Sequence, residues 1–290
     1  MIGWAAAVGA LVMAPAAAVW FLAGRSLRPP RTVTPAPALP PGARVDDVAF
    51  PSGGGTLRGW MVSPPDPQAM VLLVHGWGGD AAAMLRWSRF LAEAGFATLA
   101  FDQRGHGRSD SVRVLSPVQI AEDVRAAAAF LDDQAPHGAL PRIVLGHSMG
   151  GAGVLIALDR GLRVRAVVLS SVFARVQTVT ERFLSERGLP VRPLRGVVRH
   201  LWELRVRENL TRLEPAILVQ RIEVPLLLTH GDRDETISPE ELHVLERHSP
   251  EHLTESLLVL GAGHSDLTDF ADYRAGVSRF LQRVLSRAEA

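Results

Sequence analysis

Short apolar runs alternate with longer segments of helical periodicity along most of the chain. The apolar runs predict strands at residues 70–75, 96–101, 142–145, 164–169, 224–229 and 256–260. A hairpin is expected before them, because residues 45–50 and 56–62 flank a turn made of one serine and three glycines. Strands that alternate with helices build a parallel sheet with helices on both faces. The pattern therefore predicts an α/β fold, with a mostly parallel twisted sheet, for residues 45–290.

Two helices in this pattern have readable starts. Ser116 is followed by Pro117 and then Gln119, which combines an N-cap, a first-turn proline and a capping box. These residues predict a helix over 118–131. The final helix is expected to begin near Asp266 and to continue through apolar positions up to residue 281.

Residues 173–221 interrupt the alternation with a mostly helical insertion, which we expect to form a lid at the sheet end where α/β folds bind ligands. Its apolar positions follow helical spacing, and its arginines fall largely on another side. The positions on the apolar side are Val197, Val198, Leu201, Trp202 and Leu204 or Arg205, and the arginines on the other side are Arg195, Arg199 and Arg207. Two interpretations stay open: an amphipathic helix packed on its own core, or a basic cap that contacts anionic lipid and admits acyl chains. Trp202 is the candidate substrate contact in this insertion.

The first 24 residues carry no charged side chain and predict an N-terminal transmembrane anchor. A helix of this length extends about 36 Å, which is enough to cross the hydrocarbon core of a membrane. Trp4 and Trp20 lie near its two ends, where interfacial aromatic residues are common. Three arginines follow, Arg25, Arg28 and Arg31. The positive-inside rule then predicts a single-pass membrane protein whose catalytic domain is cytoplasmic.

Two other interpretations of residues 1–24 remain. The small residues at 14–18 suit a cleaved signal peptide, which would make the protein secreted or periplasmic, although no basic residue precedes the apolar run. A buried core helix is disfavoured because the segment is apolar on all sides. It also leads into a Pro-rich stretch, and residues 25–44 are therefore expected to form a stiff linker.

Composition narrows the class of protein. The 290 residues are 47% hydrophobic and 21% charged, which suits a globular domain and excludes a disordered chain. The formal charge is +1, so no general attraction to nucleic acid is expected. The chain has no cysteine and no lysine, which excludes a thiol nucleophile, a cysteine zinc site and a lysine-containing phosphate loop. No G-x-G-x-x-G turn follows the first core strand, and Pro250 interrupts the His248 and His252 pair, so neither a cofactor nor a metal is expected.

The sequence Gly-His-Ser-Met-Gly at 146–150 is a G-x-S-x-G motif between a predicted strand and a predicted helix. A serine on such a tight turn projects its Oγ, and the helix start behind it favours developing negative charge. Ser148 is therefore the candidate nucleophile. The alternative is an ordinary small turn that opens a helix. His147, inside the same motif, is a candidate substrate contact.

A serine nucleophile needs a base, and the base needs a carboxylate that orients it. His264 follows the last predicted strand and is the candidate base. Asp234 and Asp232 both follow an earlier strand. Asp234 is preferred because it lies farther into the loop, whereas Asp232 is expected to brace that loop and stays the alternative. No acid follows the strand before these, at Ser170 and Ser171.

Attack on a carbonyl also requires donors for the developing oxyanion. The segment His-Gly-Trp-Gly-Gly at 75–79 ends another predicted strand. We expect the backbone N–H groups of Trp77 and Met149 to be the donors, with Gly76 close to the substrate. The alternative is a flexible turn before a helix. The loop at 101–109 is expected to be structural, and a contact with the substrate channel is its second role to consider.

These motifs together resemble those of the α/β-hydrolase superfamily, and in particular its serine-aminopeptidase and monoglyceride-lipase-like branch. The resemblance covers residues 45–285 and rests on an HG turn, a D-x-R-G-x-G-x-S loop, GHSMGG, and a late Gly-x-x-Asp and Gly-His. These occur at His75 and Gly76, 102–109, 146–151, 231–234, and Gly263 with His264. The resemblance implies an α/β-hydrolase fold and a triad of Ser148, Asp234 and His264. The insertion departs most from this pattern.

The function expected from these residues is hydrolysis of a carboxylic ester, including lipid-like esters, through an acyl-enzyme on Ser148. The same triad would also serve an acyltransferase or a peptidase. A membrane-tethered binding module that keeps the fold without activity is the non-enzymatic alternative. The expected partners are an ester substrate and, through the N-terminal helix, a membrane. The sequence does not indicate an oligomeric state.

Overall fold

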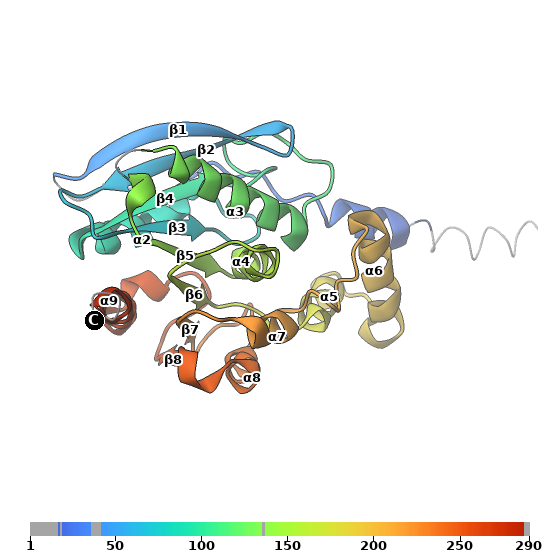
Figure 1. Cartoon of the computed structure of the whole chain (residues 1–290). Coiled ribbons are helices and arrows are strands. Elements are labelled where there is room, and N and C mark those ends of the chain that lie inside the picture. The colour runs from blue at the N-terminus through green and yellow to red at the C-terminus, as the bar shows by residue number, and fades with distance from the viewer. Residues whose placement is uncertain (1–16, 18, 36–41, 135–136, 287–290) are drawn as a thin grey trace, which may run out of the picture.

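The computed structural model describes the whole chain except residues 1–16, 18, 36–41, 135–136 and 287–290 (Figure 1). Its strands are β1 (Arg44–Ser52), β2 (Gly55–Ser63), β3 (Ala69–Val74), β4 (Phe96–Asp102), β5 (Arg142–His147), β6 (Ala166–Ser170), β7 (Leu226–Gly231) and β8 (Thr254–Val259). In the described part they form one eight-stranded sheet in the order β1-β2-β4-β3-β5-β6-β7-β8. The hairpin β1–β2 and the pair β2–β4 are antiparallel, and the remaining neighbours are parallel. The predicted hairpin and mostly parallel sheet are confirmed.

The central strands separate two apolar cores. Along β3, Met70 and Leu72 face one core while Val71 and Leu73 face the other, as successive side chains of a strand must. Both faces are buried, which explains why the central strands are continuous apolar runs rather than alternating ones.

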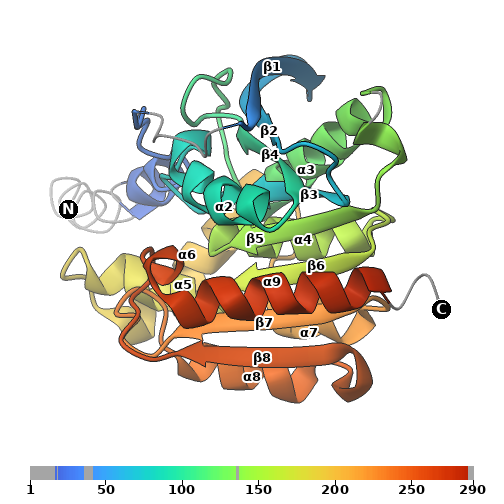
Figure 2. The same cartoon turned by 90° about the vertical axis from the view of Figure 1, so that its left-hand side faces the viewer.

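Helices cover both faces of the sheet. The helices are α2 (Ala81–Glu93), α3 (Pro117–Asp132), α4 (Met149–Asp159), α5 (Val176–Ser185), α6 (Val191–Val206), α7 (Pro215–Leu218), α8 (Glu240–His248) and α9 (Ala271–Ser286). α2 and α9 lie on one face, in front of the sheet in Figure 2, and α3, α4, α7 and α8 pack on the other. The predicted start of α3 is confirmed, because the Ser116 Oγ accepts a hydrogen bond from the Val118 N–H at 3.2 Å. The final helix begins later than predicted, because a short 3-10 turn at Leu267–Asp269 precedes α9.

The insertion between β6 and β7 carries α5, α6 and α7, and α5 and α6 project from the sheet (Figure 1). Phe183 of α5 and Trp202 of α6 pack edge to face, with ring centroids 5.4 Å apart. The buried face of α6 carries Val198, Trp202 and Val206, whereas Val197 is half exposed. The apolar stripe of this helix is therefore narrower than its sequence spacing predicted.

The N-terminal segment differs from the expected linker. Residues 19–25 are helical, and residues 26–35 continue along the domain rather than away from it. None of the helices described is both long and apolar enough to span a membrane. The predicted transmembrane anchor falls largely on residues 1–16 and 18, which lie outside the described residues.

Candidate active site

Ser148 lies at the sharp turn between β5 and α4. Its backbone adopts φ 53° and ψ −125°, in the left-handed half of conformational space that a non-glycine residue rarely occupies. Neighbouring backbone crowds both sides of this turn. A Cβ at Gly146 would lie 2.6 Å from the Cα of Gly151, and one at Gly150 would lie 2.3 Å from the His75 carbonyl oxygen. The glycines of the motif are therefore required for the turn to close, and the strained turn is the kind found at functional sites.

Three strand ends bring Ser148, His264 and Asp234 together. The His264 Nε2 lies 3.1 Å from the Ser148 Oγ, and the His264 Nδ1 lies 2.7 Å from the Asp234 Oδ2. The three residues follow β5, β8 and β7, whose carboxyl ends share one edge of the sheet. Asp232 lies apart from this contact and accepts a hydrogen bond from the Gly261 N–H at 2.6 Å. The arrangement is a continuous path of hydrogen bonds from hydroxyl to imidazole to carboxylate.

Asp234 is held in its charged form. Burial opposes its ionisation, but hydrogen bonds from His230 and His264 outweigh that penalty and lower the pKa of the carboxyl below its ordinary value. Its other oxygen, Oδ1, accepts the N–H groups of Thr236 and Ile237, both at 2.8 Å. A carboxylate fixed by this many donors orients the imidazole that it contacts.

His230 is a site residue that the sequence analysis missed. Its side chain is buried, and its Nε2 lies 3.2 Å from the Asp234 Oδ2 and 2.9 Å from the Ile237 carbonyl oxygen. Its position in the sequence was a signal that could have found it. A polar residue at the end of a mainly apolar strand is expected to be buried, and a buried polar side chain needs a hydrogen-bond partner, here the nearby Asp234. His230 and His264 thus contact the same carboxylate oxygen.

The loop after β3 lies against the nucleophile. A Cβ at Gly76 would lie 2.9 Å from the Ser148 Cβ, so the loop carrying Trp77 touches the Ser148 turn. Met149 is the first residue of α4, and the opening N–H groups of a helix have no intrahelical acceptor. Trp77 and Met149 both line the cavity that contains Ser148. Both residues therefore border the cavity beside Ser148, and their N–H groups stay the candidate donors for an oxyanion formed there.

Two buried histidines hold this loop in place. The His106 Nε2 accepts the Gly78 N–H at 3.0 Å, and the His75 Nδ1 donates to the Gly76 carbonyl at 2.8 Å. Burial, with a smaller contribution from the neighbouring His75, lowers the pKa of His106 to about 3. Burial also lowers the pKa of His75. Both rings are neutral at physiological pH, which keeps the His106 nitrogen available as an acceptor.

Two predicted substrate contacts occupy other positions. The His147 Nε2 donates to the His264 carbonyl at 2.8 Å, and its ring is buried rather than directed at the cavity. Burial lowers the pKa of His147 to about 4, so the ring is a neutral donor. Gly76 packs against the Ser148 Cβ, and it is not one of the described residues that line the cavity. Both residues therefore support the site from outside, and Trp202 is the predicted contact that does line it.

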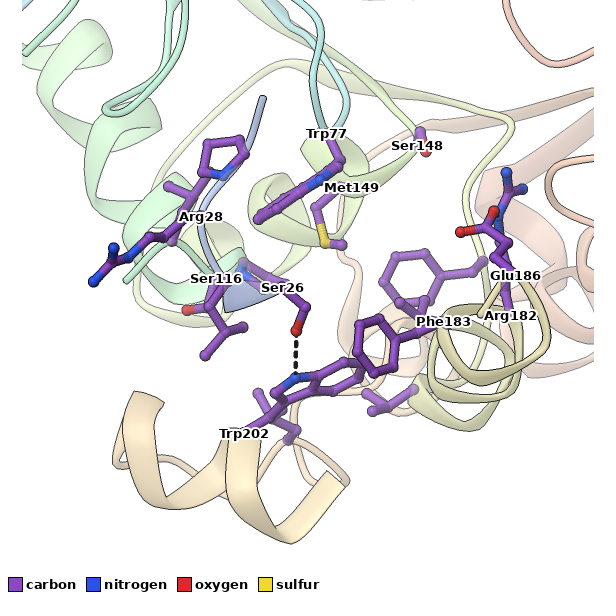
Figure 3. A pocket seen from close by; sticks show the side chains of 18 of the residues that line it. Ser26, Arg28, Trp77, Ser116, Ser148, Met149, Arg182, Phe183, Glu186 and Trp202 are labelled. Carbon is purple, nitrogen blue, oxygen red and sulfur yellow. Dashed lines mark hydrogen bonds and ion pairs between the residues drawn. The ribbon is translucent and has the colours of Figure 1, made fainter. Parts of the chain in front are cut away.

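A cavity of about 740 Å³ opens from Ser148 and His264 between the sheet and the insertion (Figure 3). Trp77 and Met149 lie on the side of Ser148, and Phe183 and Trp202 lie across the hollow. Most of the lining is apolar. Its polar groups include an ion pair in which the Arg182 Nε lies 2.7 Å from the Glu186 Oε1. In the part of the chain that the structure describes, no cluster of histidine and acidic side chains is arranged to hold a metal ion. The cavity suits an organic substrate with a large apolar part.

The chain is similar in sequence to known proteins over most of its length. A profile of the family described as serine aminopeptidase, S33, matches residues 65–212, which include Ser148 but end before Asp234 and His264. The uncharacterized protein YfhR of Escherichia coli K12 is 27% identical over 246 residues, 81% of this chain and 78% of that protein. A monoacylglycerol lipase of Mycolicibacterium smegmatis is 38% identical over 115 residues, 38% of this chain and 39% of the lipase.

The fold is similar to that of esterases with solved structures. The esterase Pf2001 of Pyrococcus furiosus resembles this structure with a TM-score of 0.70 and 24% identity, over 89% of this chain and 97% of the esterase. A second structure, the esterase domain of a Rhodothermus marinus protein, gives a TM-score of 0.58 at 24% identity over 82% of this chain and 96% of that domain. The likeness confirms the predicted α/β-hydrolase fold.

Proposed function

Because this chain belongs to the serine aminopeptidase S33 family of α/β-hydrolases, we propose that it is a serine hydrolase that cleaves carboxylic esters. The observation that carries the proposal is the hydrogen-bonded path from the Ser148 Oγ through His264 to Asp234, at 3.1 and 2.7 Å, on the wall of an apolar cavity. The names of the lipase and esterase relatives support the same reaction class.

The reaction follows from this geometry. His264 Nε2 removes the hydroxyl proton as Ser148 Oγ attacks the ester carbonyl carbon, and Asp234 stabilises the imidazolium that forms. The carbonyl oxygen becomes negative and accepts the N–H groups of Trp77 and Met149, each worth about 3 kcal/mol of barrier. The intermediate collapses, His264 donates the proton to the leaving alkoxide, and the alcohol departs from an acyl-enzyme. Water then repeats the sequence, with His264 as its base, and releases the acid.

An ester is favoured over a peptide with a free amino terminus because of the cavity's charges. Recognition of an α-ammonium group needs an available carboxylate. Among the described residues that line the cavity, the one acid is Glu186, and it already pairs with Arg182. The apolar lining instead matches the acyl or alcohol part of an ester.

The test is covalent labelling with a fluorophosphonate, followed by hydrolysis of p-nitrophenyl esters. Ser148 should carry the adduct, and Ser148→Ala should abolish both labelling and hydrolysis. Folded protein that neither labels at Ser148 nor cleaves any ester would reject catalysis and favour a binding module. Labelling combined with acyl transfer to an added alcohol or amine, or with peptide cleavage, would reassign the second step.

We also propose that the part of residues 1–24 that precedes Leu22 anchors the protein in a membrane with the catalytic domain on the cytoplasmic side, since Leu22 lines the cavity and Ala23 is buried in the domain. The uncharged N-terminal stretch and the arginines after it support this arrangement. Full-length protein should remain in the membrane fraction after washing with sodium carbonate. Recovery of a soluble protein that lacks these residues would favour a cleaved signal peptide instead.

A further inference from the structure

The N-terminal segment is built into the catalytic domain although it precedes that domain in the sequence. Ala23 is fully buried and Leu27 is 8% exposed, values typical of the core itself. The Leu27 carbonyl accepts the Leu115 N–H at 2.9 Å, and the Arg31 Nε donates to the Gly107 carbonyl at 2.8 Å. The segment therefore has a defined position on the domain.

This segment connects the two structures that flank the cavity. On the lid side, the Ser26 Oγ accepts the Trp202 Nε1–H at 3.0 Å, as the dashed line in Figure 3 shows. On the other side, the Thr32 Oγ1 donates to the Gly78 carbonyl at 2.7 Å. Gly78 neighbours Trp77, whose N–H is a candidate oxyanion donor. The segment thus bridges α6 and the loop next to the nucleophile.

The same segment supplies one wall of the cavity. Residues 22–30, called here the N-terminal wall, contribute Leu22, Leu27, Pro29 and Pro30 to the lining. Their charged neighbour Arg28 is exposed, and in Figure 3 its guanidinium points away from the hollow. Arg25 and Ser26 also line the cavity, so the wall combines an apolar surface from two leucines and two prolines with a polar part, and the apolar part faces the same hollow as Phe183 and Trp202.

We propose that the N-terminal wall is a specificity-determining part of the substrate site, and that the space it closes takes an extended hydrocarbon chain of the ester. The proposal rests on the ester hydrolysis proposed above. An apolar channel gains about four-fold in selectivity for each methylene that it buries. Leu22 and Leu27 therefore limit the length of the hydrocarbon chain that the cavity can bury, although both residues precede the part of the chain that carries the triad.

The experiment measures the ratio of kcat/KM for p-nitrophenyl dodecanoate to that for the butyrate, using full-length protein in detergent. Leu22→Trp fills the cavity, and loss of room for two methylenes should lower the ratio about 16-fold. Leu22→Ala enlarges it and should raise the ratio. The control is Val33→Trp, which adds the same ring to the same segment at an exposed position outside the cavity and should leave the ratio unchanged.

A ratio taken on one preparation does not depend on the fraction of folded enzyme, so reduced stability cannot imitate the effect. The proposal is overturned if Leu22→Trp and Leu22→Ala both keep the ratio within about two-fold of the wild type, or if Val33→Trp shifts it as much as Leu22→Trp. Failure of the proposed function has a different signature. In that case the unsubstituted protein cleaves neither ester and takes up no fluorophosphonate at Ser148.

Discussion

The catalytic residues and the N-terminal wall border the same cavity, but different interactions stabilise each of these two regions. The catalytic corner, meaning Ser148, Asp234 and His264 with the loops that carry them, is fixed by hydrogen bonds at the ends of buried parallel strands. The N-terminal wall and α6 are held mainly by apolar packing, with a few polar contacts such as Ser26 to Trp202. Changes in the corner should alter the rate for every ester, whereas changes in the wall should alter the preference between esters.

The largest expected effect comes from the nucleophile. Ser148→Ala should lower kcat about a million-fold for short and long esters alike, because no acyl-enzyme can form. Parallel kinetics on butyrate and dodecanoate esters, with thermal melting to verify folding, measure this. Residual activity above about one per cent would place the nucleophile elsewhere.

The orienting acid should give the next largest effect and separates two neighbouring aspartates. Asp234→Asn should lower kcat about ten-thousand-fold, because the amide no longer stabilises the His264 imidazolium. Asp232→Asn is the matched control, since Asp232 contacts the Gly261 N–H rather than the imidazole. Equal losses in the two variants would contradict the assignment of Asp234.

The histidine that holds the loop beside Ser148 should make stability depend on pH. The folded protein keeps His106 neutral, with a pKa of about 3, while the unfolded chain takes up a proton near pH 6.5. This contribution is fully present above pH 6.5 and is lost as the pH falls toward 3, by roughly 5 kcal/mol at most. Denaturant titrations across that window should show a flatter dependence in His106→Gln than in the wild type.

A matched control is needed because other histidines also titrate in this range. His252→Gln removes an exposed histidine and tests whether the flatter curve belongs to the loop. If the His106→Gln and wild-type curves stay parallel from pH 6.5 to pH 4, the inferred role of the neutral ring is wrong.

The smallest expected effect concerns the contact between the wall and the lid. Ser26→Ala removes the acceptor of the Trp202 Nε1–H and should lower the free energy of unfolding by about 1 kcal/mol, or Tm by roughly 2–4 °C. A double-mutant cycle with Trp202→Phe isolates the pair. Fully additive single effects would mean that the hydrogen bond does not couple the wall to α6.

The residues of the catalytic corner could be predicted from the sequence because each of them lies in a short, continuous motif. A G-x-S-x-G turn, a Gly-x-x-Asp turn and a Gly-His pair each follow an apolar run, and parallel strands place their ends at one edge. The supporting roles of His230 and His147 were missed, and the latter was assigned to substrate; the loop that carries His106 was expected to be structural, but the contact that His106 makes was not predicted. A histidine's partner depends on which loop packs over it, and the sequence spacing of these residues does not specify that.

The order of strands and helices, the tight turn at Ser148 and the three residues that approach one another there follow from the amino-acid sequence alone, because backbone conformation and strand burial depend on neighbouring residues. That residues 22–30 line the cavity became visible only in the folded protein. Proline-rich composition predicts a spacer, and nothing local indicates that Ser26 meets Trp202, 176 positions away. Such contacts form only when the whole chain closes, since their stability comes from apolar surfaces that distant segments bury together.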